Sequence, residues 1–254
     1  MTPERRAAYL DALGIDWYRS KHVGDPPDLT VPASAEVGRP IATATTPPVG
    51  QPGSETSVPV DPTGVADDVP NEWPQLRSVV ASCQSCTLGS TRTQAVFGVG
   101  NEAADLMIVG EAPGAEEDRR GEPFVGRAGH LLDAMLTAIG LSRTEVFIAN
   151  ILKCRPPNNR DPQADEVAAC RRYLERQIAL VSPRLLLAVG RIAAHALLDV
   201  TDPLGRLRGR IHETESWPAP VIVTYHPAYL LRTPAQKARS WQDLKAVRKL
   251  LHTQ

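Results

Sequence analysis

Apolar residues after residue 72 occur in short runs that are separated by longer amphipathic segments. Four runs are almost wholly apolar, which is typical of strands buried on both faces. They are residues 105–109, 146–151, 185–189 and 221–224. Helical spacing of apolar positions marks residues 128–139, 163–180, 191–198 and 235–251. This alternation predicts an α/β fold with a four-stranded parallel sheet flanked by helices on both faces.

Polar or glycine-rich segments follow three of the four predicted strands. Residues 110–114 read GEAPG after the first, Asn150 stands at the end of the second, and His226 follows the fourth. Ligands of parallel sheets bind in the crevice beyond the carboxyl ends of the strands. The sequence therefore predicts that these three segments meet in one cleft.

The first 72 residues have a different character. Residues 1–24 contain a short amphipathic stretch ending in Trp17, which predicts either a frayed terminal helix or a docking peptide for a protein partner. Residues 25–72 show no apolar periodicity, and eleven of the 23 prolines lie within residues 1–72. We expect a flexible N-terminal extension with a disordered Pro-rich linker at 25–72, followed by a domain at 73–254.

Composition and charge narrow the class of protein. The chain has 254 residues, of which 42% are hydrophobic, so a substantial core is possible. It contains no run of about 18 apolar residues and starts with no apolar leader, so we expect a cytoplasmic protein. The formal net charge is -1, but residues 1–72 carry five Lys and Arg against eleven Asp and Glu, which leaves the remainder mildly basic. That excess suits phosphate contacts without establishing them.

Four cysteines form one close pair, Cys83 and Cys86, and one distant pair, Cys154 and Cys170. In a reducing compartment paired thiols are more often metal ligands or redox centres than disulfides. Four thiolates suit either zinc or an iron-sulfur cluster. The wide second pair favours a cluster over a zinc ribbon, and four unrelated buried thiols are the remaining alternative.

Taken together, these motifs resemble the iron-sulfur family 4 enzymes of the uracil-DNA glycosylase superfamily. The matching strings are CQSC at 83–86, GEAPGAEED at 110–118, GEPFVG at 121–126, NILKC at 150–154, NNRDP at 158–162 and HPAYLLR at 226–232. The resemblance implies a four-stranded parallel sheet flanked by helices, a 4Fe-4S cluster on the four cysteines, and hydrolysis of the bond between uracil and deoxyribose in DNA. We expect turnover by a monofunctional, monomeric enzyme.

Within this resemblance, four residues are expected to bind the base. Gly110 and Gly114 allow close approach of backbone amides. Phe124, one of three Phe, is the expected stacking platform, with an ordinary core aromatic as the alternative. Asn150 is expected to donate to uracil O4 and accept from N3–H, a pattern that cytosine inverts; the alternative is a turn-capping Asn.

The catalytic roles follow from charge separation when the glycosidic bond breaks. His226 is the expected donor to uracil O2, and a solvent-exposed His before Pro is the alternative. The better-known relatives carry Asp at the position of Ala112, so Glu111 and Glu117 are equal candidates for orienting water. Asn159 is a further polar contributor, and the alternative for Glu117 is a charged helix N-terminus.

The expected DNA contacts lie in two loops. Leu230 aligns with the apolar wedge of related enzymes, and Arg232 suits a phosphate contact. Arg155 and Arg160 lie beside the expected cluster and suit further phosphate contacts. The other function classes weighed are a catalytically silent DNA-damage binding protein and a metal-stapled interaction protein.

Overall fold

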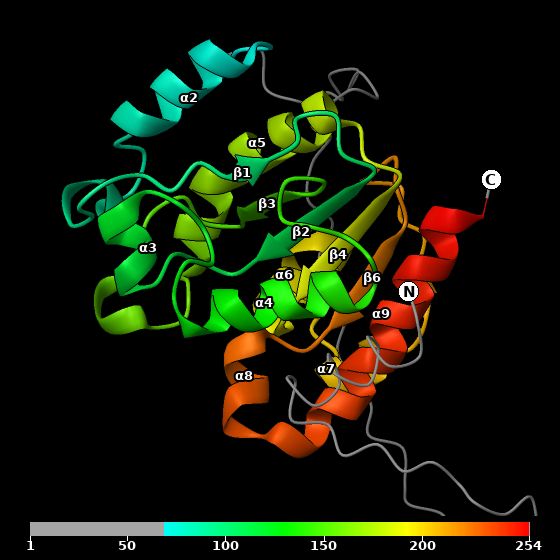
Figure 1. Cartoon of the computed structure of the whole chain (residues 1–254). Coiled ribbons are helices and arrows are strands. Elements are labelled where there is room, and N and C mark those ends of the chain that lie inside the picture. The colour runs from blue at the N-terminus through cyan, green and yellow to red at the C-terminus, as the bar shows by residue number, and fades with distance from the viewer. Residues whose placement is uncertain (1–68, 254) are drawn as a thin grey trace, which may run out of the picture. The chain divides into compact units, whose positions relative to one another are not determined.

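The computed structural model describes residues 69–253 (Figure 1). The predicted N-terminal segment at 1–24, its possible protein partner and the linker up to residue 68 lie outside the described residues. Val69 falls within the range predicted as linker, yet its side chain is buried in the core. The packed part of the chain therefore includes residues just before 73.

A six-stranded mixed sheet forms the centre of the fold, in the order β1-β3-β2-β4-β6-β5. The four central strands are parallel, buried throughout and match the four predicted runs. They are β2 (Leu106–Gly110), β3 (Phe147–Asn150), β4 (Leu185–Val189) and β6 (Val221–Thr224). Two antiparallel edge strands, β1 (Val99–Gly100) and β5 (Ile211–His212), were not predicted, because two residues show no alternation.

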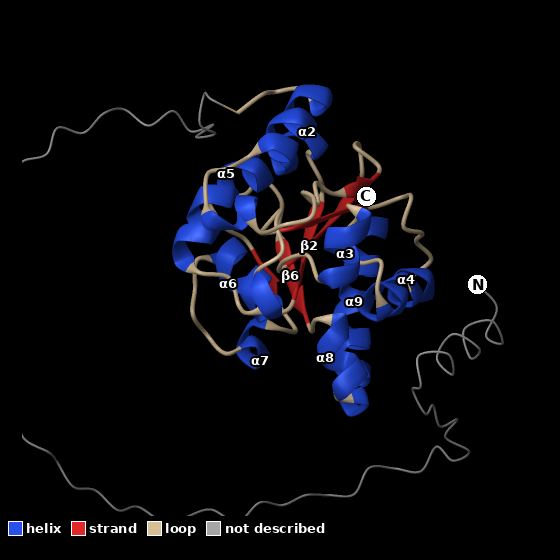
Figure 2. Ribbon diagram, turned by 90° about the vertical axis from the view of Figure 1, so that its left-hand side faces the viewer, coloured by secondary structure: helices blue, strands red, loops and turns tan. Residues whose placement is uncertain are grey.

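Alternate residues of the central strands pack into two cores, one on each face of the sheet (Figure 2). The first face is covered by α2 (Trp73–Ser82), α5 (Ala164–Val181) and α6 (Arg191–Leu198). The second is covered by α4 (Arg127–Ala138), α8 (Pro227–Arg232) and α9 (Lys237–His252). The expected arrangement of helices on both faces is confirmed.

Four long helices were predicted to within a few residues, the last one as the 3-10 turn η3 (Pro234–Gln236) followed by α9. The sequence did not predict α2, α8 or the short helix α7 (Leu204–Leu207), whereas α3 (Ala115–Arg120) matches the charged helix N-terminus that was the alternative for Glu117. Two further 3-10 turns, η1 (Thr87–Ser90) and η2 (Pro157–Asn159), lie in the loops next to cysteines. Within residues 69–253 every helix is too short or too polar to cross a membrane.

Candidate active site

A cleft of about 450 Å³ lies at the carboxyl ends of the parallel strands. It brings together eight of the residues singled out in the sequence, which come from the ends of β2, β3 and β6 and from the loops after them. They are Glu111, Gly114, Glu117, Phe124, Asn150, Asn159, His226 and Arg232. Ala112, Ala128, Asp161 and Ala228 complete the lining. The prediction that the three motif segments meet in one cleft is confirmed.

Gly110 allows two cleft side chains to pack against bare backbone. It pairs with Asn150 across β2 and β3, and a Cβ atom at Gly110 would lie 2.4 Å from Asn150 Oδ1 and 2.6 Å from Phe124 Cζ. Asn150 is 2% exposed, and its Oδ1 has no hydrogen-bond partner among the described residues. A buried acceptor without a donor costs free energy, so this atom suits a ligand that brings an N–H.

Phe124 is held in a left-handed backbone conformation, with φ of +54°. Arg143 donates to the Phe124 carbonyl at 3.2 Å and also to the Pro123 carbonyl. Gly129 of α4 approaches so closely that a Cβ there would lie 1.7 Å from the Phe124 carbonyl oxygen. The sequence did not indicate Arg143 or Gly129, because both act on the backbone of the Phe124 loop through contacts that depend on how the loop folds.

Glu117 also fixes the loop that carries Phe124. Its Oε1 accepts hydrogen bonds from the backbone amides of Val125 and Gly126, each at 3.0 Å. The residue belongs to α3, which begins after Gly114 and carries three acidic residues in its first turn. Glu117 thus lines the cleft and also anchors the segment that carries Phe124.

His226 enters the cleft as a neutral imidazole. Its Nδ1 accepts a hydrogen bond from the Ala228 amide at 3.1 Å, which leaves the proton on Nε2. The pKa of His226 is lowered to about 4, mainly by burial and then by repulsion from Arg232, with Glu117 opposing the shift. The ring stacks on Phe124 with centroids 5.5 Å apart and planes 29° apart.

Glu111 lies beside a charged pair that the sequence did not single out. Asp161 accepts a hydrogen bond from Arg191 at 2.6 Å. Burial raises the pKa of the Glu111 carboxyl, and Asp161 adds to the rise while Arg191 opposes it. The Leu152 amide donates to the backbone carbonyl of Glu111 at 3.0 Å, but among residues 69–253 no protein group donates a hydrogen bond to its carboxylate, so both carboxylate oxygens are available to a water or a ligand.

The residues expected to contact DNA differ in how accessible their side chains are. Leu230 is 1% exposed and packs in the core against Leu131, Met135 and Leu244, so it would have to leave this packing to act as an apolar wedge, and that role stays a prediction. An inserted wedge must be solvent-accessible, whereas α8 turns this side chain inward. Leu231, the next residue, is only partly buried.

The three arginines differ in how far they are engaged. Arg232 is exposed at the cleft. Arg155 donates to Asn159 Oδ1 at 2.8 Å. Arg160 makes a two-pronged ion pair with the buried Glu166, at 2.8 and 2.5 Å, and Glu166 also caps the start of α5. Arg160 is therefore tied to the start of α5, whereas Arg232 is exposed where a phosphate can reach it.

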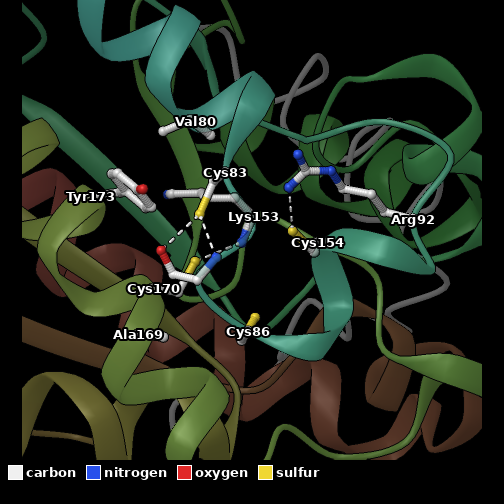
Figure 3. Close-up of a pocket in the computed structure, with 11 residues that line it drawn as sticks. Val80, Cys83, Cys86, Arg92, Lys153, Cys154, Ala169, Cys170 and Tyr173 are labelled. Carbon is white, nitrogen blue, oxygen red and sulfur yellow. Dashed lines mark hydrogen bonds between the residues drawn. The ribbon is translucent and has the colours of Figure 1, made fainter.

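The four cysteines line a second, smaller pocket beside α5 (Figure 3). Cys83 ends α2, Cys86 precedes η1, Cys154 follows β3 and Cys170 lies in α5. Within residues 69–253 no three His, Cys, Asp or Glu side chains are grouped as ligands of a single metal ion. The pocket nevertheless joins all four thiols predicted to act together.

Donors surround these sulfur atoms. Arg92 donates to Cys154 Sγ at 2.9 Å, and the Lys153 amide donates to Cys170 Sγ at 3.2 Å. Burial raises the pKa of Cys170 to about 11, against the attraction of Lys153. Four thiols with cationic and N–H donors directed at them fit a cationic metal centre, which would supply the positive charge that buried thiolates require.

Comparisons with known proteins place this chain among DNA-repair sequences. The profile of the uracil DNA glycosylase superfamily matches residues 97–250. A Type-4 uracil-DNA glycosylase of Archaeoglobus fulgidus is 45% identical over 177 residues, which cover 67% of this chain and 89% of that protein. One from Sulfurisphaera tokodaii is 42% identical over 70% of this chain and 84% of its own. A Type-5 uracil-DNA glycosylase of Thermus thermophilus is 36% identical over 41% of this chain and 53% of its own.

Proposed function

This chain belongs to the uracil DNA glycosylase superfamily, and we propose that it excises uracil from DNA by hydrolysing the N-glycosidic bond, leaving an abasic site. The observation that carries the proposal is the buried, unpaired Oδ1 of Asn150 in a cleft that also contains Phe124 and His226. A cleft built this way suits a flat base with an N–H at one edge.

Reading of the base is assigned to Asn150. Its Oδ1 accepts from uracil N3–H while its amide nitrogen donates to O4. Cytosine presents an acceptor at N3 and a donor at the adjacent position, so both contacts would be mismatched. Leaving two buried polar groups unpaired costs about 1–3 kcal/mol each, enough for strong discrimination. Phe124 stacks on the base that has been extruded from the helix.

Departure of the base is assigned to His226. As the glycosidic bond breaks, negative charge develops on the uracil, and the Nε2–H donates to O2. A neutral donor suffices, because a preorganised hydrogen bond that strengthens at the transition state is worth several kcal/mol. The bond from Ala228 to Nδ1 keeps the ring in the tautomer that this step needs.

Positive charge develops on the sugar at the same time, and Glu111 is assigned to it. The carboxylate orients the attacking water and stabilises the sugar cation, and its unpaired oxygens support this role. Glu117 has one oxygen committed to the loop of Phe124, which favours a positioning role. Gly110 and Gly114 admit the base, and Asn159 lines the cleft as a further polar contributor.

The phosphate backbone is assigned to Arg232 and Arg155. Arg232 ends α8 and lines the cleft, Arg155 contacts the cleft residue Asn159, and neither forms an ion pair among the described residues. Arg160 is a weaker candidate, because a phosphate would compete with Glu166 for its guanidinium. Extruding a base costs a few kcal/mol, and such contacts offset part of that cost in single- and double-stranded DNA.

A 4Fe-4S cluster is assigned to the four cysteines, with zinc as the alternative. Bound there, the group would cross-link α2, η1, the loop after β3 and α5, and so fix the loop that carries Asn159 and Asp161. The donor set of four thiols supports it. A cytoplasmic, monomeric protein remains a prediction.

The test uses the purified full chain and a labelled oligonucleotide with one uracil, in single- and double-stranded form. We expect release of uracil and an alkali-sensitive abasic site, with no cleavage of matched thymine or cytosine strands. His226→Ala should lose most activity while keeping the visible absorption of the cluster. Binding of uracil-containing DNA without any release would instead indicate a silent damage-binding protein, and a colourless active enzyme would indicate zinc.

A further inference from the structure

One buried lysine, Lys153, lines the cysteine pocket (Figure 3). Lys153 is 1% exposed and immediately precedes Cys154. Its backbone amide donates to Cys170 Sγ at 3.2 Å, and its carbonyl accepts from the Val96 amide at 2.8 Å. These two hydrogen bonds fix the main chain of Lys153 beside the cysteine pocket.

The side chain of Lys153 runs the other way, toward the residue that reads the base. Its Nζ donates to the backbone carbonyl of Asn150 at 2.8 Å and to Gln177 Oε1 at 2.6 Å. Gln177 in turn donates to the Phe97 carbonyl at 2.9 Å. Gln177 and Cys170 both belong to α5, so a single helix contacts the two ends of Lys153.

Burying an ammonium group is costly unless its donors are satisfied by well-placed acceptors. Here those acceptors are a carbonyl at the end of β3 and a side chain of α5, so the arrangement fixes one relative to the other. Asn150 ends β3, and the orientation of its peptide bears directly on where its side-chain amide points. Polar groups held by charge-assisted hydrogen bonds are rigid.

We propose that Lys153 is a positioning residue that couples the cysteine centre to uracil recognition by Asn150. The inference rests on the proposed function. A group bound to the four cysteines would hold α5 and residues 150–154 at a fixed relative position. Lys153 would transmit that position to the side-chain amide of Asn150. Because energetic coupling between two sites is reciprocal, binding of uracil must perturb the cysteine centre in return.

The test compares the holoprotein with Lys153→Met, which keeps the apolar stem and removes the donors, and with Lys245→Met, an exposed lysine of α9, as the matched control. Affinity for free uracil is measured as competitive inhibition of cleavage. We expect at least about tenfold weaker binding for Lys153→Met, as for loss of one hydrogen bond to a charged donor, and no change for Lys245→Met. Visible absorption should be retained.

A spectroscopic readout separates coupling from mere stability. Free uracil is titrated into each holoprotein while the visible circular dichroism of the cluster is followed. The wild-type spectrum should change with saturation of the site, whereas the Lys153→Met spectrum should stay constant at concentrations that fill its weakened site. A protein in which Lys153 serves only folding would show the same uracil-dependent change in both.

Each outcome decides the inference. A coloured Lys153→Met with unaltered affinity for uracil overturns it. Where this variant does not fold or loses its colour, Gln177→Met decides, because it leaves Lys153 in place and removes the α5 partner of Nζ together with the bond to the Phe97 carbonyl. Weakened uracil binding supports the coupling, and wild-type affinity overturns it. Failure of the wild-type protein itself to bind or release uracil would refute the proposed function and is seen in the same assay.

Discussion

The Ala228 amide donates to Nδ1 of His226 at 3.1 Å, so the imidazole caps the helix that follows it. Pro227 occupies the first position of α8, where its missing N–H costs nothing. Protonation of Nδ1 would remove the acceptor and leave the Ala228 amide facing a cation. The local structure that begins α8 therefore also selects the neutral tautomer with the proton on Nε2.

The first prediction concerns the protonation of His226. Its pKa in the folded protein is about 4, against an ordinary 6.5, because burial and then Arg232 disfavour the cation. Titration by ¹⁵N NMR, with assignment by His226→Gln, should show a neutral Nε2–H ring down to about pH 4. A ring that titrates near pH 6.5 in the folded protein would contradict this.

The lowered pKa of His226 also makes the free energy of unfolding depend on pH. Between pH 6.5 and about 4 the unfolded chain binds a proton at His226 that the folded chain does not. The folded state therefore loses stability as pH falls through this window, and His226→Gln should lose less than the wild type. Urea unfolding at several pH values gives the comparison.

The second prediction concerns Glu111, whose carboxyl pKa is raised mainly by burial. Because the folded-state pKa is raised, the carboxyl contributes stability at acid pH that is lost as pH rises through that value. Glu111→Gln should therefore melt at a higher temperature than the wild type at pH 7, while kcat falls by about 10²–10⁴-fold, as for loss of a general base. The acid limb of the wild-type rate profile should disappear with it.

A third prediction separates Glu117 from Glu111. Glu117 accepts two backbone amide bonds through one oxygen, and the carboxamide of Gln can accept them as well. Glu117→Gln should keep kcat/KM within about threefold, whereas Glu117→Ala should lose about tenfold or more through the freed loop of Phe124. Equal losses for Gln and Ala would instead assign Glu117 to the water.

There are physical reasons for what the sequence predicted and for what it did not predict. The central strands are buried on both faces, so their apolar runs were readable without any tertiary information. Asn150 and Gly110 were correctly expected together, because parallel strands bring their carboxyl ends to one edge. The cysteine spacing predicted that the thiols share one pocket, because two cysteines three residues apart can both face one metal centre.

The contacts that orient these residues depend on loops far apart in sequence. Arg143 reaches the Phe124 carbonyl from 19 positions away, and Gln177 reaches Lys153 from 24 away. No local pattern encodes such pairs. The direction of Leu230 likewise depends on how α8 packs against α4 and α9, which the alignment with a wedge residue did not indicate.

The fourth prediction follows from that burial. Leu230→Ala should lower the free energy of unfolding by about 2–5 kcal/mol, the range for truncating a fully buried leucine. Leu231→Ala, at a partly buried position, should cost less. Urea unfolding measures both. Activity of folded Leu230→Ala should fall equally on single- and double-stranded substrates. A loss confined to duplex DNA, with stability unchanged, would support the wedge role.

The fifth prediction tests the close packing in the cleft. Gly110→Ala places a methyl group 2.4 Å from Asn150 Oδ1 and 2.6 Å from Phe124 Cζ, so both side chains must move away. Misplacement of reacting or binding groups by about 1 Å can cost about 100-fold, and we expect a loss of that size in kcat/KM. Steady-state cleavage of a uracil-containing strand is the measurement.

Gly205→Ala is the matched control, because Gly205 lies in α7 with open space around the position of its Cβ. The activity of Gly205→Ala should equal that of the wild type. Its free energy of unfolding should rise by about 0.5–1 kcal/mol, because Ala has a better helix propensity than Gly. Equal activity of Gly110→Ala and Gly205→Ala would mean that the cleft widens freely, and Asn150 and Phe124 would then lack the fixed geometry on which recognition of uracil depends.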